Sequence, residues 1–277
     1  MTEEAPGRLV RLAVRASAAD AEAVLGALLD LAPEGLEQRD GESWVEYALY
    51  GAAGRLPALP DGPTEIAGAQ VEVTRGDVAP DWGRRWRAFH RPQLIGERLH
   101  VRAPWHAPAR GQGAIDLVID PGQAFGTGAH PTTRLCLELM LRSRVSAGSL
   151  VDLGCGSGVL AIAAHQLGFA PVVALDADGA AIEATHANAR ANGAAIDRVE
   201  RFDLRLQALP AADVVVANLT RPLLLTVAER LGDARPRTLV ASGVLDREVD
   251  GVARAFAPLR ERARRSEAGW SALLLAA

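Results

Sequence analysis

The sequence predicts an α/β protein, in which a doubly wound, Rossmann-like domain follows a small α+β module. From residue 150 onward, short apolar strands alternate with helix-like segments, a pattern that gives a parallel sheet with helices on both faces. A glycine-rich turn follows the first of these strands directly. The predicted strands are 150–153, 172–175, 199–202, 214–217 and 238–242, with the apolar tail 270–275 closing the sheet, and the predicted helices are 158–167, 178–191 and 222–231.

The first module is predicted from local signals. Apolar residues recur at helical spacing after Ser17, a suitable N-cap, and Asp40-Gly41 separates two strand-like runs in the manner of a hairpin. The predicted elements are a strand at 9–14, a helix at 21–31, hairpin strands at 36–39 and 43–49, a Pro- and Gly-rich loop at 51–68 and a strand at 70–74. This order indicates a ferredoxin-like arrangement of a few strands and one or two helices.

The patterns divide the chain into three segments. We expect a small α+β domain at 1–76, a linker helix at 77–97 and the main domain at 98–277. The segment 80–92 combines arginines with tryptophans and a phenylalanine. It is either a solvated linker whose aromatic residues pack on a neighbouring domain or a docking surface for an acidic partner.

Composition limits the function classes. The net charge is −4 and the pI is near 5.9, which disfavours a broad electrostatic contact with nucleic acid. The two cysteines, Cys136 and Cys155, are too few for a disulfide framework and unsuitably spaced for zinc. No stretch approaches the ~20 apolar residues of a membrane helix, and the first residues lack a signal-peptide pattern. We therefore expect a cytoplasmic protein without a membrane partner.

The turn after the first strand predicts a nucleotide site. Gly154, Gly156 and Gly158 alternate with other residues just before a helix, where a backbone without side chains lets a ligand approach. The first N–H groups of that helix are expected to face the ligand. A dinucleotide fingerprint requires glycine at 159, where this chain has Val159. The G-x-G-x-G spacing is instead typical of enzymes that use S-adenosylmethionine.

Asp176 supports this choice of cofactor. It ends the next predicted strand, where a carboxylate accepts hydrogen bonds from both ribose hydroxyls of a nucleoside. The alternative is an acid that only complements a helix dipole, a role that suits Asp178 better. Asp203, after the third strand, is a weaker candidate for the adenine amino group.

A second unusual element is the loop at 120–133, which contains three glycines, an aromatic residue and adjacent hydroxyls. Phe125 is expected near the sulfonium, where a ring face attracts a cation. The hydroxyls of Thr127 and Thr133 are expected to bind the cofactor, and Pro131 to begin a helix. The alternative is a structural loop in which His130 has its own partners.

Asn218 ends a predicted buried strand, so it is expected at the same sheet edge as Gly154 and Asp176. Its carbonyl can accept a hydrogen bond from an amine and orient the nitrogen lone pair. The alternative is an asparagine that only forms a turn.

These elements together resemble the PrmA family, the methyltransferases of ribosomal protein L11. The resemblance runs from about residue 80 to the end and rests on Asp81-Trp82 with Trp86, Ala103-Pro104-Trp105-His106, the loop 120–133, the glycine turn, Asp176 and Ala217-Asn218-Leu219. It implies a class I methyltransferase that moves methyl groups from S-adenosylmethionine to lysine and N-terminal amines of that protein. It also implies cofactor contacts at Thr133, Gly154, Asp176 and Asn218, and recognition of the substrate by the small first domain.

The chemistry sets the mechanism that we expect. A lysine amine with a pKa near ~10.4 is protonated at neutral pH, and removal from water in a closed crevice lowers that pKa. We therefore expect positioning and desolvation, with Asn218 as the catalytic acceptor and no strong base. We also expect a monomer without metal or nucleic acid. The alternatives are methylation of another protein or a small amine, a non-catalytic S-adenosylmethionine-binding module and, more remotely, a nicotinamide-dependent oxidoreductase.

Overall fold

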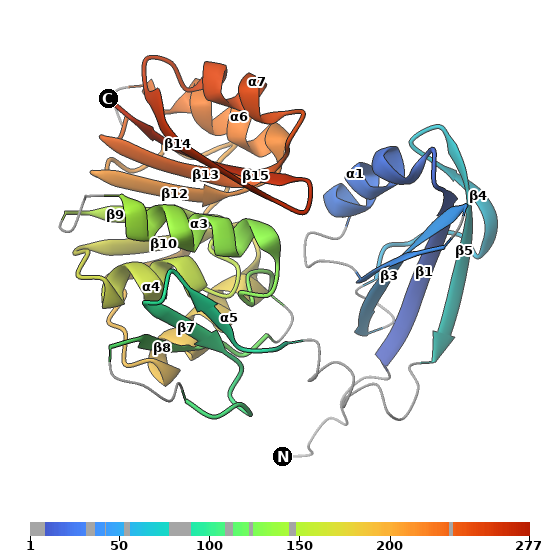
Figure 1. The fold of residues 1–277 in the computed structure, drawn as a ribbon, viewed down its shortest axis with the longest axis horizontal. Helices are drawn as coiled ribbons and strands as arrows, with labels where there is room; N and C mark the ends of the chain where they lie inside the picture. The colour runs from blue at the N-terminus through green and yellow to red at the C-terminus, as the bar shows by residue number, and fades with distance from the viewer. Residues whose placement is uncertain are drawn as a thin grey trace. The chain divides into compact units, whose positions relative to one another are not determined.

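The chain forms two compact units, Met1–Trp86 and Arg87–Ala277 (Figure 1). The structure, a computed structural model, describes residues 9–31, 37–41, 43–52, 56–77, 90–108, 113–121, 124–143, 148–232 and 235–277. The boundary between the units falls inside the predicted linker 77–97. Its residues 78–89, with Asp81, Trp82 and Trp86, lie outside the described residues, so the linker helix stays a prediction. Gln93–Ile95 form a strand, so a linker helix would have to end before them.

The first unit is an antiparallel sheet with helix α1 packed on one face. The strand order is β2-β3-β1-β5-β4. The elements are β1 (Leu9–Ser17), α1 (Ala21–Leu31), β2 (Glu37–Asp40), β3 (Trp44–Ala52), β4 (Gly62–Ile66) and β5 (Ala69–Asp77). The core joins apolar side chains of β1, β3, β4 and β5 to Val24 and Leu28 of α1, and the Tyr47 hydroxyl donates to the Ala21 carbonyl at 2.8 Å.

The predicted hairpin at Asp40-Gly41 is confirmed by the pairing of β2 with β3. The predicted loop 51–68 is partly wrong, because Gly62–Ile66 form strand β4. Among the described residues β4 is an edge strand that pairs only with β5, a position where the missing N–H of Pro63 is tolerated. A ferredoxin-like fold has its second helix in the connection that corresponds to the one between β3 and β5. In this chain strand β4 lies in that connection, of which residues 53–55 lie outside the described part.

The second unit is a seven-stranded sheet with helices on both faces, as the alternation predicts. Its strand order is β11-β10-β9-β12-β13-β15-β14. The strands are β9 (Leu150–Leu153), β10 (Val172–Asp176), β11 (Arg198–Arg201), β12 (Val214–Asn218), β13 (Thr238–Leu245), β14 (Arg260–Glu267) and β15 (Trp270–Ala276). The helices are α3 (Pro131–Arg142), α4 (Val159–Gln166), α5 (Gly179–Ala191), α6 (Arg221–Arg230) and α7 (Val249–Ala255). Helices α3, α4 and α5 cover one face, and α6 and α7 the other (Figure 1).

The sheet departs from the prediction at one edge. β11, β10, β9, β12 and β13 are parallel, but β15 inserts antiparallel between β13 and β14. The tail is therefore a strand but not the last one of the sheet. The sequence does not predict β14, because arginines and glutamates dominate this strand. Charged side chains of that kind protect an open sheet edge from pairing with another chain.

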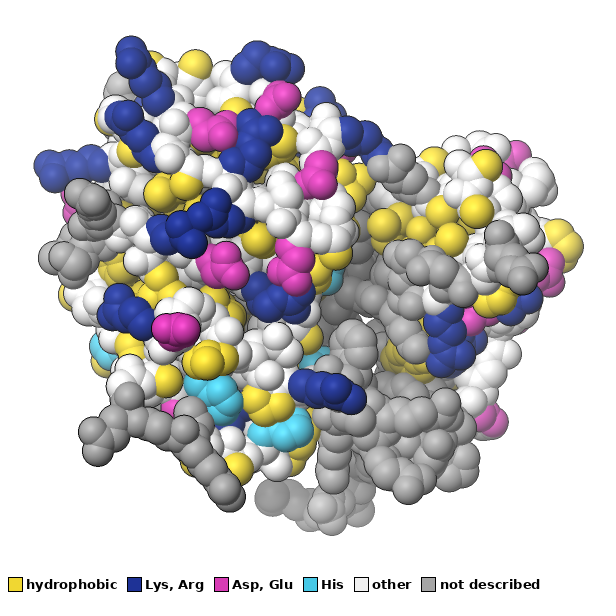
Figure 2. Space-filling model, in the orientation of Figure 1, with side chains coloured by type: hydrophobic (Ala, Val, Ile, Leu, Met, Phe, Trp, Pro, Cys, Tyr) yellow, Lys and Arg dark blue, Asp and Glu magenta, His cyan; other side chains and the backbone are white. Residues whose placement is uncertain are grey.

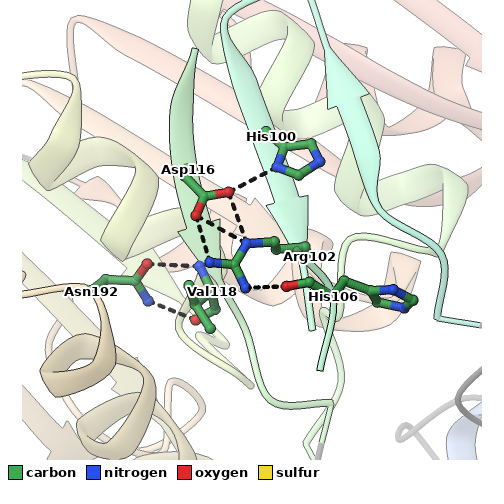
Figure 3. Close-up of polar contacts among 6 residues, drawn as sticks. All are labelled: His100, Arg102, His106, Asp116, Val118 and Asn192. Carbon is green, nitrogen blue, oxygen red and sulfur yellow. Dashed lines mark hydrogen bonds and ion pairs between the residues drawn. The ribbon is translucent and has the colours of Figure 1, made fainter. Parts of the chain in front are cut away.

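A small sheet precedes α3 and anchors the loop that leads to the site. It consists of β6 (Gln93–Ile95), β7 (Leu99–Arg102) and β8 (Ile115–Val118). Figure 3 shows Asp116 holding the Arg102 guanidinium at 2.7–3.0 Å and His100 Nδ1 at 2.8 Å. Asn192, just after α5, accepts from the Val118 N–H at 2.8 Å and donates to its carbonyl at 2.7 Å. These bonds fix the end of β8 against the main sheet's helices.

On the face drawn in Figure 2, arginine side chains lie among aspartates and glutamates in the described part of the second unit. None of the described helices is long and apolar enough to cross a membrane.

Candidate functional site

The candidate site lies at the point where the strand order of the sheet reverses. β9 lies between β10 and β12, so successive connections lead away from it on both sides, and ligands of open α/β sheets bind outside the carboxyl ends of strands at such a point. Gly154 follows β9, while Asp176 and Asn218 end β10 and β12. The fold thus brings together three of the predicted site residues at one edge of the sheet.

The N–H groups of the glycine turn form hydrogen bonds within the protein. The N–H of Gly156 donates to Asp176 Oδ2 at 2.9 Å, and the N–H of Ser157 donates to the Phe125 carbonyl at 2.8 Å. The helix N–H groups that were expected to face a ligand also have partners within the protein: the N–H of Val159 donates to Ser157 Oγ at 3.3 Å and that of Ala161 to Asp152 Oδ2 at 3.1 Å. A Cβ at Gly156 would lie 2.4 Å from the Phe125 oxygen, so this glycine admits the neighbouring loop. Gly158 is buried, with Thr185 of α5 in the place of its side chain.

Asp176 is oriented by two backbone donors. Its Oδ2 accepts from Gly156, and its Oδ1 accepts from the Asp178 N–H at 3.0 Å, while Asp178 itself caps α5. Each oxygen keeps a further lone pair for a ligand hydroxyl. Asp176 and Gly154 line a cavity of about 80 Å³ with Leu153, Leu175 and Leu219.

A larger cavity, about 400 Å³, adjoins the first one. Ala177, Phe202, Asp203 and Arg205 line both cavities, and Arg201 and Gln207 line the larger one. This places Asp203, the weaker sequence candidate, beside the Asp176 cavity. The smaller space is lined by the carboxylates of Asp176 and Asp203, by Arg205 and by leucines, while the N–H groups of Gly156 and Ser157 are engaged elsewhere. Carboxylates beside apolar side chains suit the hydroxyls and the base of a nucleoside, as in S-adenosylmethionine.

Asn218 has an amide whose two protons are directed to threonines. Its Nδ2 lies 3.2 Å from Thr132 Oγ1 and 3.4 Å from Thr133 Oγ1. Both threonines lie in the first turn of α3 and are buried. The amide oxygen is thus the group left to accept from a ligand. Thr133 acts here on Asn218, and its direct contact with the cofactor stays a prediction.

An aromatic cluster continues from Thr132. Phe125 and Trp270 each lie 5.2 Å from the His130 ring, edge to face. His130 Nδ1 accepts from the Thr132 N–H at 3.3 Å and lies 2.8 Å from the Thr132 hydroxyl. Burial, with the positive charge of Arg134, lowers the pKa of His130 to about 4. His130 is therefore neutral and holds Thr132 toward Asn218.

The loop 124–130 is attached to the glycine turn through Ser157. The Ser157 hydroxyl donates to the Gly126 carbonyl at 2.7 Å, and Asn188 of α5 donates to the Ser157 carbonyl at 2.9 Å. Asn188 also accepts from the Asp120 N–H at 2.9 Å. Thr127 is half-buried in this loop and accepts from the Ala129 N–H at 3.4 Å.

Buried ionisable groups lie beneath the turn. Asp152 of β9 has no exposed surface; its Oδ2 accepts from the Ala161 N–H at 3.1 Å, and its Oδ1 has no hydrogen-bond partner among the described residues. Burial raises the pKa of Asp152 to about 7. Burial also raises the pKa of the Cys136 and Cys155 thiols, so neither is a nucleophile at neutral pH.

Sequence reasoning missed the supporting residues. Trp270 was assigned only to a strand, and Thr132, Ser157 and Asn188 were given no role in the site. Thr132 follows Pro131 at the start of a helix, which was the one local signal for its place at the site. Within the described part of the chain, no group of histidine, cysteine or acidic residues is placed to hold a metal.

Comparison with known proteins points in one direction. A family model described as "Ribosomal protein L11 methyltransferase (PrmA)" matches residues 63–276. A ribosomal protein L11 methyltransferase of Cupriavidus metallidurans is 38% identical over 285 residues, covering 91% of each chain. One of Pseudomonas putida is 40% identical over 197 residues, 69% of this chain and 67% of the relative. The crystal structure of ribosomal protein L11 methylase from Lactobacillus delbrueckii subsp. bulgaricus aligns with a TM-score of 0.62 at 26% identity, covering 67% of this chain and 97% of that one.

Proposed function

Because the chain belongs to the ribosomal protein L11 methyltransferase (PrmA) family, we propose that it methylates lysine side chains and the N-terminal amine of ribosomal protein L11. Family membership confirms the predicted methyltransferase activity and the use of S-adenosylmethionine. It also makes the nicotinamide-dependent oxidoreductase untenable. The observation that carries the proposed amine chemistry is the orientation of Asn218, whose NH₂ group is engaged by Thr132 and Thr133.

The site residues divide into two proposed roles. Asp176 holds the ribose of the cofactor, and Gly154 and Gly156 form the adjoining wall. Asn218 Oδ1 accepts a hydrogen bond from an N–H of the incoming amine and so orients the lone pair of its nitrogen. S-adenosylmethionine, when bound, supplies an electrophilic methyl group. The chain's own contribution is to keep the amine neutral by excluding water and to hold it in line.

The aromatic cluster suits the product as well as the substrate. Each methyl transfer to an amine leaves a cation with a larger apolar surface, which aromatic faces attract. Phe125 and Trp270 each lie 5.2 Å from neutral His130, so these three rings themselves add no positive charge to repel such a cation. This arrangement supports repeated methylation of one amine.

The remaining assignments concern the whole chain. We assign substrate recognition to the first unit, with the segment 77–97 as the connection between the units. The net charge of −4 favours a protein substrate over nucleic acid. We assign the protein to the cytoplasm, where its proposed substrate is made, and treat it as a monomer.

The test is methyl transfer to purified ribosomal protein L11. All 30 basic residues of this chain are arginines, so every methylated lysine found in the assay belongs to the substrate. We expect intact-mass increases in multiples of one methyl group. Unchanged mass after incubation with the wild-type enzyme and S-adenosylmethionine would reject the substrate.

Two variants separate the proposed roles. Asn218→Ala is expected to lower kcat by about 10- to 100-fold, the loss of one hydrogen bond to a group that gains charge, with cofactor affinity largely kept. Asp176→Ala is expected to lose cofactor binding measured by calorimetry. Wild-type turnover in Asn218→Ala would reduce Asn218 to a structural residue.

A further inference from the structure

Leu219, the residue after Asn218, lies between two glycines on neighbouring strands. Its N–H donates to the Ser242 carbonyl at 3.0 Å, which continues the pairing of β12 with β13 by one residue. Gly243 follows Ser242 on β13, and Gly154 directly follows β9, on the other side of β12. Leu219 therefore meets both flanking strands at the carboxyl edge of the sheet.

On the β13 side, the contact is with the backbone of Leu219. A Cβ at Gly243 would lie 2.2 Å from the Leu219 oxygen, 2.7 Å from its carbonyl carbon and 3.0 Å from its nitrogen. Gly243 has a φ of +91° and occupies a shift in register between β13 and β15, where Ser242 and Val244 pair with successive residues. A bulge that places a glycine here lets the neighbouring main chain approach the strand.

On the β9 side, the contact is with the side chain of Leu219. A Cβ at Gly154 would lie 2.4 Å from Leu219 Cδ2 and 3.5 Å from Cγ. Gly154 was predicted to leave room for the cofactor, but the structure shows a leucine in contact with it. Leu219 and Gly154 line the same cavity as Asp176.

We propose that Gly243 is a positioning residue for Asn218 and that Gly243 and Gly154 together form a clamp on Leu219. The inference rests on the proposed function through the role of Asn218. Thr132 and Thr133 fix the Asn218 amide from the α3 side, and the clamp fixes its backbone. Neither glycine contacts the reacting amine; both act through Leu219.

The hydrogen bonds of Asn218 make its position sensitive to the clamp. Its contacts to the threonines are 3.2 and 3.4 Å long, near the upper limit for such bonds. An alanine at 243 must increase a 2.2 Å separation from the Leu219 oxygen beyond the 3.0 Å that real Cβ contacts require. A displacement of that size in the main chain of Leu219 also moves Asn218, the adjacent residue. It breaks at least the longer of the two hydrogen bonds and rotates the Asn218 side-chain amide.

The kinetic test compares Gly243→Ala, whose new methyl group would collide with the main chain of Leu219, with Gly154→Ala, whose new methyl group would collide with the Leu219 side chain. Gly243→Ala is expected to lower kcat at least 10-fold, with a smaller change in the dissociation constant for S-adenosylmethionine. Gly193→Ala is the matched control, because Gly193 also has a positive φ, +58°, but has open space around its Cβ position. It is expected to keep kcat within twofold of wild type at a temperature well below unfolding.

Leu219→Ala provides the second comparison. It removes the side-chain atoms that Gly154→Ala would strike, so the double variant is expected to regain activity relative to Gly154→Ala alone. It leaves the backbone in place, so it does not rescue Gly243→Ala. Equal rescue of both glycine variants, or a kcat for Gly243→Ala within twofold of wild type, would overturn the clamp.

A spectroscopic measurement makes the test independent of turnover. The side-chain amide signals of Asn218, assigned in ¹H–¹⁵N spectra by their loss in Asn218→Ala, are expected to shift in Gly243→Ala and to stay in place in Gly193→Ala. Unshifted signals in folded Gly243→Ala reject the clamp whatever the activity. Failure of the proposed substrate instead appears as absent turnover in the wild-type enzyme, so the two failures are distinguishable.

Discussion

Replacing Asp152 by asparagine is expected to stabilise the protein more at alkaline than at acid pH. Asp152 lies on the inner strand β9 with no exposed surface, and among the described residues only its Oδ2 has a hydrogen-bond donor, the Ala161 N–H at 3.1 Å. Asparagine has nearly the same shape, keeps an acceptor for that N–H and carries no charge at any pH. The variant therefore removes the cost of ionising a buried carboxylate.

The magnitude follows from the pKa of Asp152. Burial raises it to about 7, whereas an aspartate in an unfolded chain titrates near ~3.9. The folded state therefore holds its proton more tightly, so the free energy of unfolding falls as pH rises from about 4 to about 7 and is constant above that. A difference of about 3 pKa units corresponds to about 4 kcal/mol over the whole window, of which roughly 2.5 kcal/mol falls between pH 5 and pH 8.5.

The assay is urea unfolding of wild type and Asp152→Asn at pH 5 and pH 8.5, followed by a signal from the second unit. The stability of the variant relative to wild type is expected to rise by about 2.5 kcal/mol between the two pH values. Glu183→Gln, at an exposed position on α5, is the control, with an expected change below about 0.5 kcal/mol. A pH-independent difference for Asp152→Asn would refute the reasoning, because an added amide contact changes stability equally at both pH values.

Three further predictions concern other parts of the second unit. The pKa of His130 is lowered to about 4 in the folded protein, so the stability that this histidine contributes is full above pH 6.5 and is lost, by about 3 kcal/mol, as pH falls toward 4. His130→Asn should flatten this part of the pH–stability curve. An unchanged curve would contradict the prediction. Asn192→Ala should cost about 1–3 kcal/mol and speed hydrogen exchange at the Val118 amide, which loses its acceptor; unchanged protection of that amide would show that another acceptor holds it. Cys136 and Cys155 should resist a thiol-specific reagent in the native protein and react in urea, whereas fast native reaction would contradict their burial.

Local patterns in the sequence were sufficient for the fold class and for the strand ends of the site. The glycine turn at Gly154 follows one strand of an α/β unit, and Asp176 ends the next strand along the chain. Their relative position therefore follows from chain connectivity. The hairpin at Asp40-Gly41 was predictable for the same reason. The sequence does not predict β14 and β4, because these segments are strands through pairing with their neighbours and not through their own composition.

The roles of individual groups at the site required the tertiary structure. Gly156 and Ser157 donate to Asp176 and Phe125, so the turn is occupied by the protein itself. Asn218 meets Thr132, 86 positions away, and that contact decides which end of its amide faces the site. No local pattern encodes such a pairing.

The sequence by itself thus determined the class of fold, the class of cofactor and the strand ends that form the candidate site, because these depend on residues close together in the chain. The tertiary structure decided which backbone groups stay available and how Asn218 is oriented. The tertiary structure also explains the glycine at position 243: the main chain of Leu219, which follows another strand, occupies the space that a side chain would need. Packing between distant segments sets these properties, and packing is a property of the whole fold.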